Sequence, residues 1–332
     1  MTEKILITGG AGFIGLNLAN KLASSGYDVV IADNFERAVK DKFLEDSLSR
    51  SNISLINVDL LNEKSVLTMD KDYHAIFHLG AIIGVRHVLN KPFAVLYDNV
   101  QMLANIIKLS NLQGIEFNRL LFASTSEIYA GTLNYFDMKI PTPETTPLAV
   151  SDLTQPRTSY MLSKLYGEAL CQHSNLPFTI FRPHNVYGPR MGMSHVIPEQ
   201  LQKAHLAKER ETIEVFSVGH TRSFCYIDDA VEMLFLMLKN KNCEGLTLNL
   251  GSESPEVSIM ELVQTCHKVL SKDLTIKPKE GPPGSPVRRA PDMKFTSKLL
   301  QYESKVSLSE GLIETYGWYK DNVFDDNGQS AI

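Results

Sequence analysis

A tyrosine and a lysine four positions apart, Tyr160 and Lys164, are the residues of this sequence best suited to proton transfer. On a helix, this spacing places the phenol and the ammonium group on one face. A phenol has an ordinary pKa of about 10, and a nearby cation favours its ionised form. The pair is therefore predicted to be catalytic, with the phenol acting as a base near neutral pH.

The spacing alone does not identify the catalytic pair, because it recurs in the chain. It is also found at Tyr135 and Lys139 and at Tyr316 and Lys320. The first of these pairs lies in a proline-rich segment, and Gly317 interrupts the second. Tyr160 instead stands near the start of a stretch, 159–171, that is expected to be helical. This context favours Tyr160 and Lys164.

A hydroxyl and a carboxylate, Thr125 and Glu127, precede this pair in the chain. They follow the stretch 119–123, which is apolar after Arg119 and typical of a buried strand. Extended backbone would point both side chains the same way. Because open α/β sheets bind ligands at the carboxyl ends of their strands, both residues are predicted to be catalytic. The alternative is a Ser/Thr-rich strand exit with a solvated glutamate.

Three glycines spaced three apart follow the apolar run Ile5–Ile7, which is typical of a strand buried on both faces. An apolar stripe at helical period continues after them until Gly26. Glycines let a pyrophosphate approach the backbone, and the N–H groups at a helix N-terminus then meet its charge. The residues expected to bind a dinucleotide here are Gly9, Gly12, Phe13, Ile14 and Gly15.

Asp33 stands at the end of the next apolar run, 27–32. A carboxylate about 20 residues past such glycines binds both hydroxyls of an adenosine ribose and repels a 2′-phosphate, so NAD is favoured over NADP. Turn glycines followed by a surface aspartate are the alternative. Further cofactor contacts are expected at Asn34, Asp59, Leu60, Leu79, Gly80, Ala81 and Asn99. For Asn99, a helix N-cap is an equally good interpretation.

Strand-like and helix-like stretches alternate through the first half of the chain. This order predicts an α/β fold of the Rossmann type, a doubly wound parallel sheet, with a smaller mixed α/β substrate-binding lobe at the C-terminal side. We expect an NAD-binding domain over 1–181 and a lobe over 182–332, with a strand near 244–251 that returns to the sheet. Residues 131–156 predict a long surface loop. His78 lies in an apolar strand and is expected to be a hydrogen-bonded core histidine.

The composition limits the function classes. With 43% hydrophobic and 21% charged residues among 332, it is ordinary for a globular protein, and a formal charge of −5 argues against nucleic acid as a partner. Four cysteines without metal-ligand spacing indicate reduced thiols in a cytoplasmic protein and no metal site. A strand that begins at residue 4 leaves no room for a signal peptide, and the longest apolar patch, 233–238, is too short for a membrane.

Taken together, the motifs resemble the extended short-chain dehydrogenase/reductase family of nucleotide-sugar epimerases, dehydratases and decarboxylases. The resemblance runs from residue 4 to about 318. It is carried by Gly9-x-x-Gly12-x-x-Gly15, Asp33, Ser124-Thr-Ser126, Tyr160-x-x-x-Lys164 and Arg182-Pro-x-Asn-Val-Tyr-Gly-Pro189.

The resemblance implies tightly held NAD, a nucleoside-diphosphate sugar as substrate, and a homodimer formed through helices near 99–112 and 158–174. It implies that Tyr160 takes the proton of the sugar 4-hydroxyl while a hydride passes from C4 to NAD, and that Lys164 contacts the nicotinamide ribose. The residues that it assigns to the substrate are Thr125, Ser126, Asn185, Arg190, Arg222 and Arg289. Guanidinium groups suit a diphosphate, although surface salt bridges are the alternative for Arg222 and Arg289.

Glu127 bears on which reaction the resemblance favours, because a C4 epimerase needs no second acid or base. The run 124–129 is similar to that of uronate decarboxylases and 4,6-dehydratases, whose glutamate lies close to C5. Three further stretches resemble the UDP-glucuronate decarboxylases: Pro156-Arg157, Gly188-Pro-Arg-Met-Gly-Met193 and Arg288-Arg-Ala-Pro-Asp292. By this resemblance, Arg289 is expected to hold the departing carboxylate.

Other stretches, 160–164 and 182–185, look more like the epimerases, and His184 has no assigned role. The favoured prediction is decarboxylation of a nucleotide-linked hexuronate. Epimerisation at C4 or C5, 4,6-dehydration, and an NAD-sensing scaffold with a dead site are the alternatives.

Overall fold

The computed structural model describes residues 2–114, 116–150, 152–281 and 286–325. Its centre is a parallel sheet of seven strands in the order β11-β6-β5-β4-β1-β2-β3. The strands are β1 (Lys4–Thr8), β2 (Asp28–Asp33), β3 (Ile53–Asn57), β4 (Tyr73–His78), β5 (Arg119–Ala123), β6 (Phe178–Pro183) and β11 (Leu246–Leu250). The predicted returning strand is confirmed, because β11 pairs in parallel with β6.

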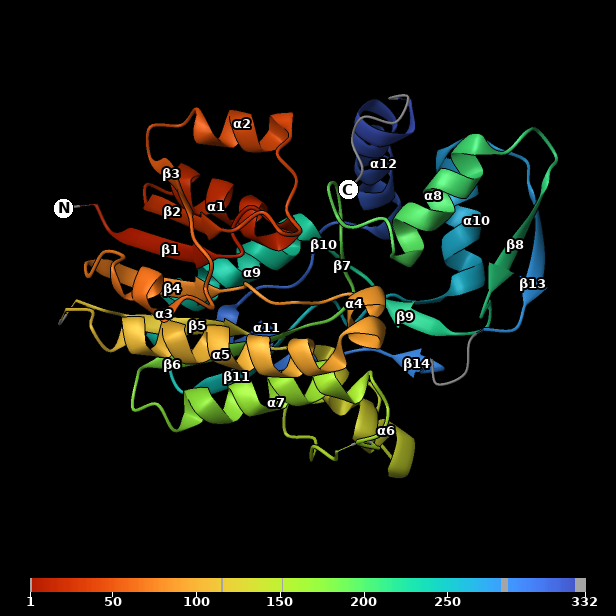
Figure 1. Cartoon of the computed structure of the whole chain (residues 1–332). Coiled ribbons are helices and arrows are strands. Elements are labelled where there is room, and N and C mark those ends of the chain that lie inside the picture. Colours follow the sequence, from red (N-terminus) through yellow and green to blue (C-terminus); the bar gives the residue numbers. More distant parts are fainter. Residues whose placement is uncertain (1, 115, 151, 282–285, 326–332) are drawn as a thin grey trace.

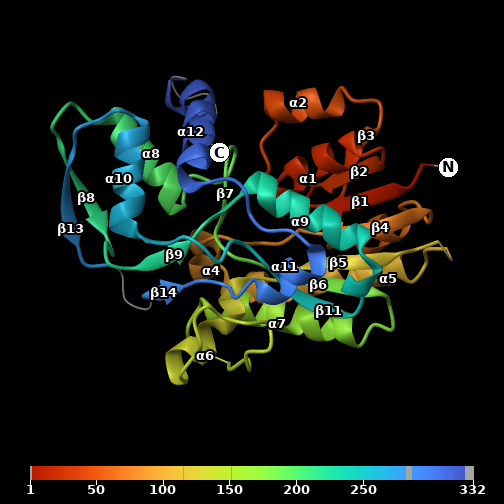
Figure 2. The same cartoon turned by 180° about the vertical axis from the view of Figure 1, so that it is seen from behind.

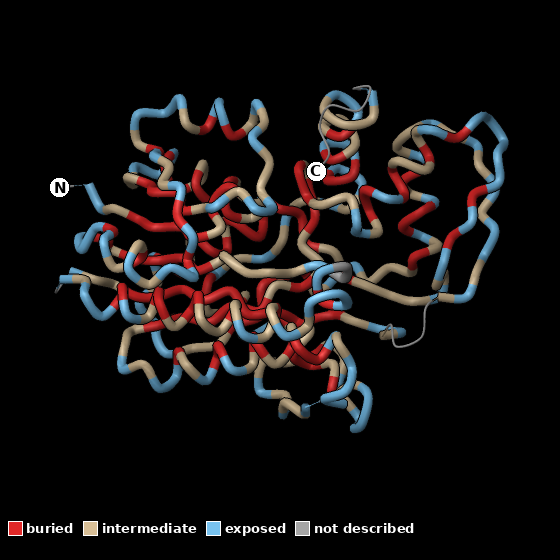
Figure 3. Tube along the Cα trace, viewed as in Figure 1, coloured by how far each residue is buried: buried red, intermediate tan, exposed pale blue. Residues whose placement is uncertain are grey.

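Helices cover both faces of this sheet (Figures 1 and 2). The helices of one face are α3 (Glu63–Leu67), α5 (Pro92–Ser110) and α7 (Thr158–Gln172), and those of the other are α1 (Phe13–Ser24), α9 (Ile227–Lys239) and α11 (Lys294–Leu300). Neighbouring residues of β1 face opposite sides: Leu6 packs in the core under α5, whereas Ile5 and Ile7 pack in the core under α1 and α9. The buried residues accordingly follow the strands in Figure 3. The predicted Rossmann-type fold is confirmed.

The connections of this sheet reverse direction beside β1. From β1 the chain moves outward to β2 and β3, and it then returns to place β4 on the other side of β1. Such a reversal opens a crevice at the carboxyl ends of the two strands. The glycine turn after β1 and the segment after β4 therefore meet at one place.

The second lobe holds small sheets and helices (right side of Figure 1). Its strands are β7 (Val186–Tyr187), β8 (Thr212–Phe216), β9 (Thr221–Ser223), β10 (Cys225–Tyr226), β12 (Glu256–Ser258), β13 (Thr275–Lys279) and β14 (Arg288–Arg289). Its helices are α8 (Val196–Leu206), α10 (Ile259–Val269) and α12 (Leu308–Tyr319). β9 pairs with both β12 and β14, which brings Arg289 beside Arg222. The domain division at residue 181 stays a prediction. Both α9 and β11 lie beyond residue 181, yet β11 is a strand of the main sheet and α9 covers one of its faces.

The segment 131–156 differs in part from the predicted loop. Helix α6 (Ala130–Tyr135) occupies its start, directly after a single 3₁₀ turn, Ser126–Tyr129. The hydroxyl of Thr132 donates to the carbonyl of Pro147 at 2.6 Å and accepts from the N–H of Ala149 at 3.0 Å. Thr132 thus anchors the helix to the following loop, a tertiary contact that apolar periodicity does not reveal.

Among the residues described, no helix combines the length and the apolar character that crossing a membrane requires.

His78 is a core histidine, as predicted. Its Nδ1 lies 2.7 Å from the hydroxyl of Thr8, and its ring stacks on Phe122. Burial lowers the pKa of His78 to about 3, and burial lowers that of His184 to about 3 as well. Both rings are therefore neutral in the folded protein at pH values where they are charged in the unfolded chain.

Acid should therefore destabilise the protein already below pH 6.5. The unfolded chain binds protons at these histidines below about pH 6.5, and the folded protein does so only near pH 3, so stability falls as the pH falls between these values. At pH 5 each histidine should cost about 2 kcal/mol of unfolding free energy. Urea denaturation at pH 7 and pH 5 measures the loss, and His78→Gln should lose about 2 kcal/mol less than the parent between these pH values. Equal losses in both proteins would contradict this account.

Candidate active site

Two glycines of the turn, Gly9 and Gly15, are packed too tightly for a side chain. A Cβ on Gly9, whose φ is +66°, would lie 2.7 Å from the backbone nitrogen of Gly80, and a Cβ on Gly15 would lie 2.5 Å from the carbonyl oxygen of Gly9. Gly12 caps the N-terminus of α1 without a side-chain hydrogen bond. This bare backbone at the start of a helix fits a pyrophosphate. Leu60 lies against Gly80, so the structure brings both predicted residues to the turn.

Asp33 stands beside the same turn. Its Oδ2 accepts the N–H of Ala11 at 3.1 Å and its Oδ1 accepts the N–H of Phe35 at 2.9 Å. Burial raises the pKa of Asp33, and these two hydrogen bonds act against the rise. Asp33, at the carboxyl end of β2, can thus hold an adenosine ribose next to the glycines.

Asn99 is not an N-cap, because α5 begins at Pro92. Its side chain accepts the N–H of Ile82 at 2.7 Å, and it donates to the carbonyl of Ile82 at 3.1 Å and to the hydroxyl of Ser163 at 3.2 Å. Asn99 therefore connects the segment after β4 to α7. The contact on α7 is Ser163, which directly precedes Lys164.

Lys164 is buried, and its ammonium donates to the carbonyl of Ala123 at 2.7 Å. Burial lowers the pKa of Lys164 to about 8. The phenol of Tyr160 is hydrogen-bonded to Thr125. Helix α7 thus brings Tyr160 and Lys164 to the carboxyl end of β5, where Thr125 also lies.

The expected lowering of the phenol pKa is wrong for this arrangement. Burial raises the pKa of Tyr160 to about 12, the nearby charge of Glu127 adds to the rise, and the Thr125 hydrogen bond and the charge of Arg37 oppose it. The helical spacing predicts that Tyr160 and Lys164 share a face, so that a cation lies near the phenol. Burial, however, has a larger effect on the pKa of the phenol than nearby positive charge.

Glu127 forms an ion pair with Arg289 at the mouth of the site, with Nη1 and Oε1 2.7 Å apart. Glu127 lies in the 3₁₀ turn rather than in extended backbone, so the prediction that extended backbone points Thr125 and Glu127 the same way is wrong. The two residues are nevertheless neighbours, because the hydroxyl of Thr125 accepts the N–H of Glu127 at 3.2 Å. The charge of Arg289 lowers the pKa of Glu127, against a rise from burial, and Arg157 and Arg222 lower it further.

Arg222 projects from β9 beside Arg289. Its guanidinium donates to the carbonyls of Thr221 and Pro286, each at 2.7 Å, and burial together with the charge of Arg289 lowers its pKa to about 10. Asn185 donates to the carbonyl of Ser223 at 2.9 Å, which places it next to this strand. Ser126 is buried at the start of the 3₁₀ turn.

Arg190 does not lie with the other predicted substrate residues. Its guanidinium is bonded to Asp41, Ala11 and Val39, beside the glycine turn. Arg190 thus contacts the cofactor-binding half of the molecule, and its contact with the substrate stays a prediction.

Two supporting features were not predicted from the sequence. Arg37, in the segment after Asp33, lies close enough for its charge to act on both Asp33 and Tyr160. A buried ion pair, Arg182 with Glu168, joins β6 to α7 through two hydrogen bonds of 2.9 Å and 2.7 Å. The sequence signals that could have indicated these features are the position of Arg37, four residues after Asp33, and the presence of Arg182 at the start of the 182–189 motif.

His184 lies beneath the 3₁₀ turn, with its ring against Tyr129. The amide nitrogen of Asn249 donates to the carbonyls of Thr142 and Asp292, so its oxygen accepts from Nε2 of His184, 3.1 Å away. The lone pair of His184 is therefore on Nδ1, which is buried without a hydrogen-bond partner in the described part of the chain.

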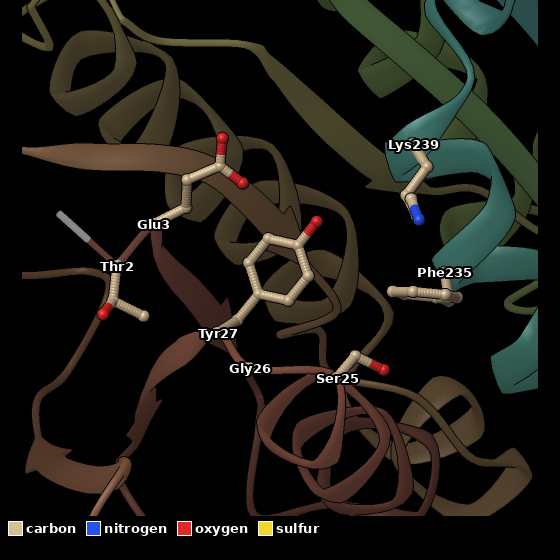
Figure 4. A pocket seen from close by; sticks show the side chains of 7 residues that line it. All are labelled: Thr2, Glu3, Ser25, Gly26, Tyr27, Phe235 and Lys239. Carbon is tan, nitrogen blue, oxygen red and sulfur yellow. The ribbon is translucent and has the colours of Figure 1, made fainter.

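A separate hollow of about 550 Å³ lies at the opposite edge of the sheet, next to the amino ends of β1 and β2. Figure 4 shows Glu3, Tyr27, Phe235 and Lys239 around it. Ligands of open α/β sheets bind at the carboxyl ends of the strands, so this hollow is not the active site.

The protein family follows from comparison with known sequences. The model of the NAD dependent epimerase/dehydratase family matches residues 5–251. The chain belongs to this family. Membership confirms the predicted resemblance, the cofactor NAD and an enzymatic role over the scaffold alternative.

Individual members of the epimerase/dehydratase family align over nearly the whole chain. A UDP-N-acetyl-α-D-glucosaminuronate decarboxylase of Bacillus cytotoxicus is 33% identical, covering 97% of this chain and 99% of the relative. A UDP-glucuronate 4-epimerase of Thermodesulfobacterium geofontis is 29% identical, covering 96% of each. The structure of UDP-glucuronic acid 4-epimerase from Bacillus cereus, in complex with UDP-glucuronic acid and NAD, is 28% identical with a TM-score of 0.80, covering 96% of this chain and 99% of that protein.

Proposed function

We propose that this enzyme decarboxylates a UDP-linked hexuronate after transient oxidation of the sugar at C4. The observation that carries the proposal is the ion pair of Glu127 and Arg289, 2.7 Å apart and close enough to Tyr160 for the Glu127 charge to act on its phenol. A simple C4 epimerase has no use for a second acid and base beside the base that acts at C4.

The chemistry at C4 belongs to Tyr160, Thr125 and Lys164. Tyr160 takes the proton of the sugar 4-hydroxyl, and Thr125, bonded to the same phenol, orients it. Lys164 is the ammonium expected to hold the nicotinamide ribose. When bound, NAD supplies the hydride acceptor and a positively charged ring, which favours the phenolate.

A ketone at C4 turns the C5 carboxylate into a β-keto acid. The bond between C5 and the carboxylate then breaks, carbon dioxide leaves, and the electron pair of the broken bond forms an enolate that a proton converts to the ketone. Return of the hydride to C4 then gives the pentose. Arg289 is placed to hold the carboxylate as it leaves, and Glu127 to control the proton at C5. The group that binds the carboxylate and the group that handles the proton thus form one ion pair.

The charge balance around Glu127 supports an anionic substrate. Three arginines, Arg157, Arg222 and Arg289, act on this single carboxylate. Their excess of positive charge suits a diphosphate and a sugar acid, because guanidinium binds both as a planar, permanently charged donor. The named activity of the Bacillus cytotoxicus relative, on an N-acetylated UDP-hexuronate, supports the same substrate class.

Epimerisation at C4 is the second candidate. It is favoured by the two UDP-glucuronate 4-epimerase relatives, which act on the same kind of sugar acid. Both reactions begin with oxidation at C4 and diverge afterwards.

Incubation with NAD and either UDP-glucuronate or its 2-acetamido counterpart, followed by mass spectrometry, tests the proposal. We expect carbon dioxide and a UDP-pentose or its acetamido form. An unchanged mass with altered sugar stereochemistry would favour the epimerase. Loss of water from UDP-glucose, which has the C6 hydroxyl that a hexuronate lacks, would favour a 4,6-dehydratase.

We also propose a homodimer formed through α5 and α7, which lie side by side on one face of the sheet (Figure 1). Three aromatic side chains are exposed on these helices: Phe93 by 77%, Tyr97 by 55% and Tyr166 by 55%. The rings of Phe93 and Tyr97 stack on each other, and such exposed apolar patches mark contact surfaces.

The double substitution Phe93→Asp with Tyr97→Asp should convert a dimer into a monomer, because both charges would be buried at the contact. Light scattering at micromolar concentration measures the mass. A monomeric parent, or a variant that stays dimeric, would refute this interface.

The predicted cytoplasmic location is retained as part of this proposal. All four cysteines are free and buried in the fold, which suits a reducing compartment.

A further inference from the structure

Arg190 is a buried arginine at the point where the chain enters the smaller lobe, three residues after β7. Only 4% of its side chain is exposed. Its backbone has a φ of +70°, in the left-handed region that residues other than glycine rarely adopt. A conformation of this kind persists where the surroundings hold it, which directs attention to what the side chain contacts.

The three hydrogen bonds of this guanidinium all reach the first 41 residues of the chain. Nε donates to Oδ2 of Asp41 at 2.6 Å, Nη1 to the carbonyl of Ala11 at 2.7 Å, and Nη2 to the carbonyl of Val39 at 2.8 Å. Arg190 thus bridges the glycine turn and the segment between β2 and α2 (Lys42–Leu48). Charged, buried hydrogen bonds of this kind are the strong ones.

The same contact supports the carboxylate expected to bind the adenosine ribose. Ala11, whose carbonyl accepts from Arg190, donates its own N–H to Asp33. Asp41, whose Oδ2 accepts from Arg190, uses its Oδ1 to cap α2 through the N–H of Leu44 at 2.9 Å. Removal of the guanidinium would therefore loosen the glycine turn and the segment that follows Asp33 together.

We propose that Arg190 is a positioning residue that sets how slowly NAD leaves the protein, by locking the glycine turn against the segment that follows Asp33. Since Arg190 belongs to the chain that opens the smaller lobe, the contact also ties that lobe to the bound dinucleotide. The inference concerns retention of the cofactor and holds for a decarboxylase and an epimerase alike.

The test is the exchange of bound NAD for isotopically labelled NAD, followed by mass spectrometry in the purified protein. Arg190→Met keeps the apolar stem and removes all three hydrogen bonds, and it should accelerate NAD release about tenfold or more. Arg190→Lys keeps the charge without the planar fork of the guanidinium. It should release NAD at a rate between those of Arg190→Met and the parent.

Arg288→Met is the matched control. Arg288 also forms an ion pair, through two hydrogen bonds to Glu256, but this pair lies within the smaller lobe. It should release NAD at the parental rate. If Arg190→Met does not fold, Arg190→Lys and Asp41→Asn carry the test, since asparagine still caps α2.

Parental NAD release in the Arg190 variants would overturn the proposal, whether or not their melting temperature without NAD falls, because a merely structural role predicts only that fall. A raised KM for the nucleotide sugar with unchanged NAD release would restore Arg190 as a substrate ligand. Equal acceleration in Arg288→Met would also overturn the proposal.

Discussion

Phenylalanine in place of Tyr160 should lower turnover by about three orders of magnitude while the protein still binds NAD. The substitution removes one oxygen, which is hydrogen-bonded to Thr125 and which we propose takes the proton of the sugar hydroxyl. The ring that packs against its neighbours stays, so the fold and the cofactor contacts should be preserved. Initial rates with the nucleotide sugar give the loss, and the NAD content after gel filtration shows whether the cofactor is retained.

Tyr135→Phe is the control for this experiment. Tyr135 has the same spacing to a lysine, Lys139, but it is 57% exposed at the end of α6. Its substitution should leave turnover unchanged. If Tyr160→Phe stays within about tenfold of the parent, then Tyr160 is not the base.

Glutamine in place of Glu127 should reduce the release of carbon dioxide by about two orders of magnitude. Glutamine has nearly the shape of glutamate but neither its charge nor its proton affinity. Because Arg289 lowers the pKa of Glu127, the carboxylate is ionised at neutral pH, and the substitution leaves Arg289 without the anionic partner that lies 2.7 Å away. Carbon dioxide release measures the effect, and the absorbance of bound NADH shows that oxidation at C4 still occurs.

The neighbouring ion pair supplies the control. Arg288, the residue before Arg289, pairs with Glu256 at the same distance of 2.7 Å. The Glu256→Gln variant should release carbon dioxide at the parental rate. Parental release of carbon dioxide from Glu127→Gln would remove Glu127 from the reaction.

The cofactor half of the site could be predicted because its signals are local. A short apolar run, three spaced glycines and an aspartate after the next strand lie within 33 residues of the N-terminus. Each element is specified by its neighbours in the chain, since glycine permits the close approach of Gly9 to Gly80 and a buried strand needs apolar residues on both faces. The helix that carries Tyr160 and Lys164 was recognised for the same reason.

The parts that were wrong depend on burial and on contacts between distant residues. Extended backbone was expected through Glu127, but the chain turns there. Lys164 was expected to lower the pKa of Tyr160, whereas burial raises it to about 12. Neither burial nor a turn imposed by packing can be obtained from the spacing of two residues.

The sequence by itself determined the class of this protein: a Rossmann-type sheet, a bare glycine turn for NAD, and a tyrosine and a lysine on one helix face. Only the tertiary structure decided the partners of the charged side chains. Glu127 and Arg289 are 162 positions apart, and Ala11 and Arg190 are 179 apart. Contacts over such separations are set by the order of the strands and by the packing of the two lobes, because each buried charge must find a partner wherever the fold brings one.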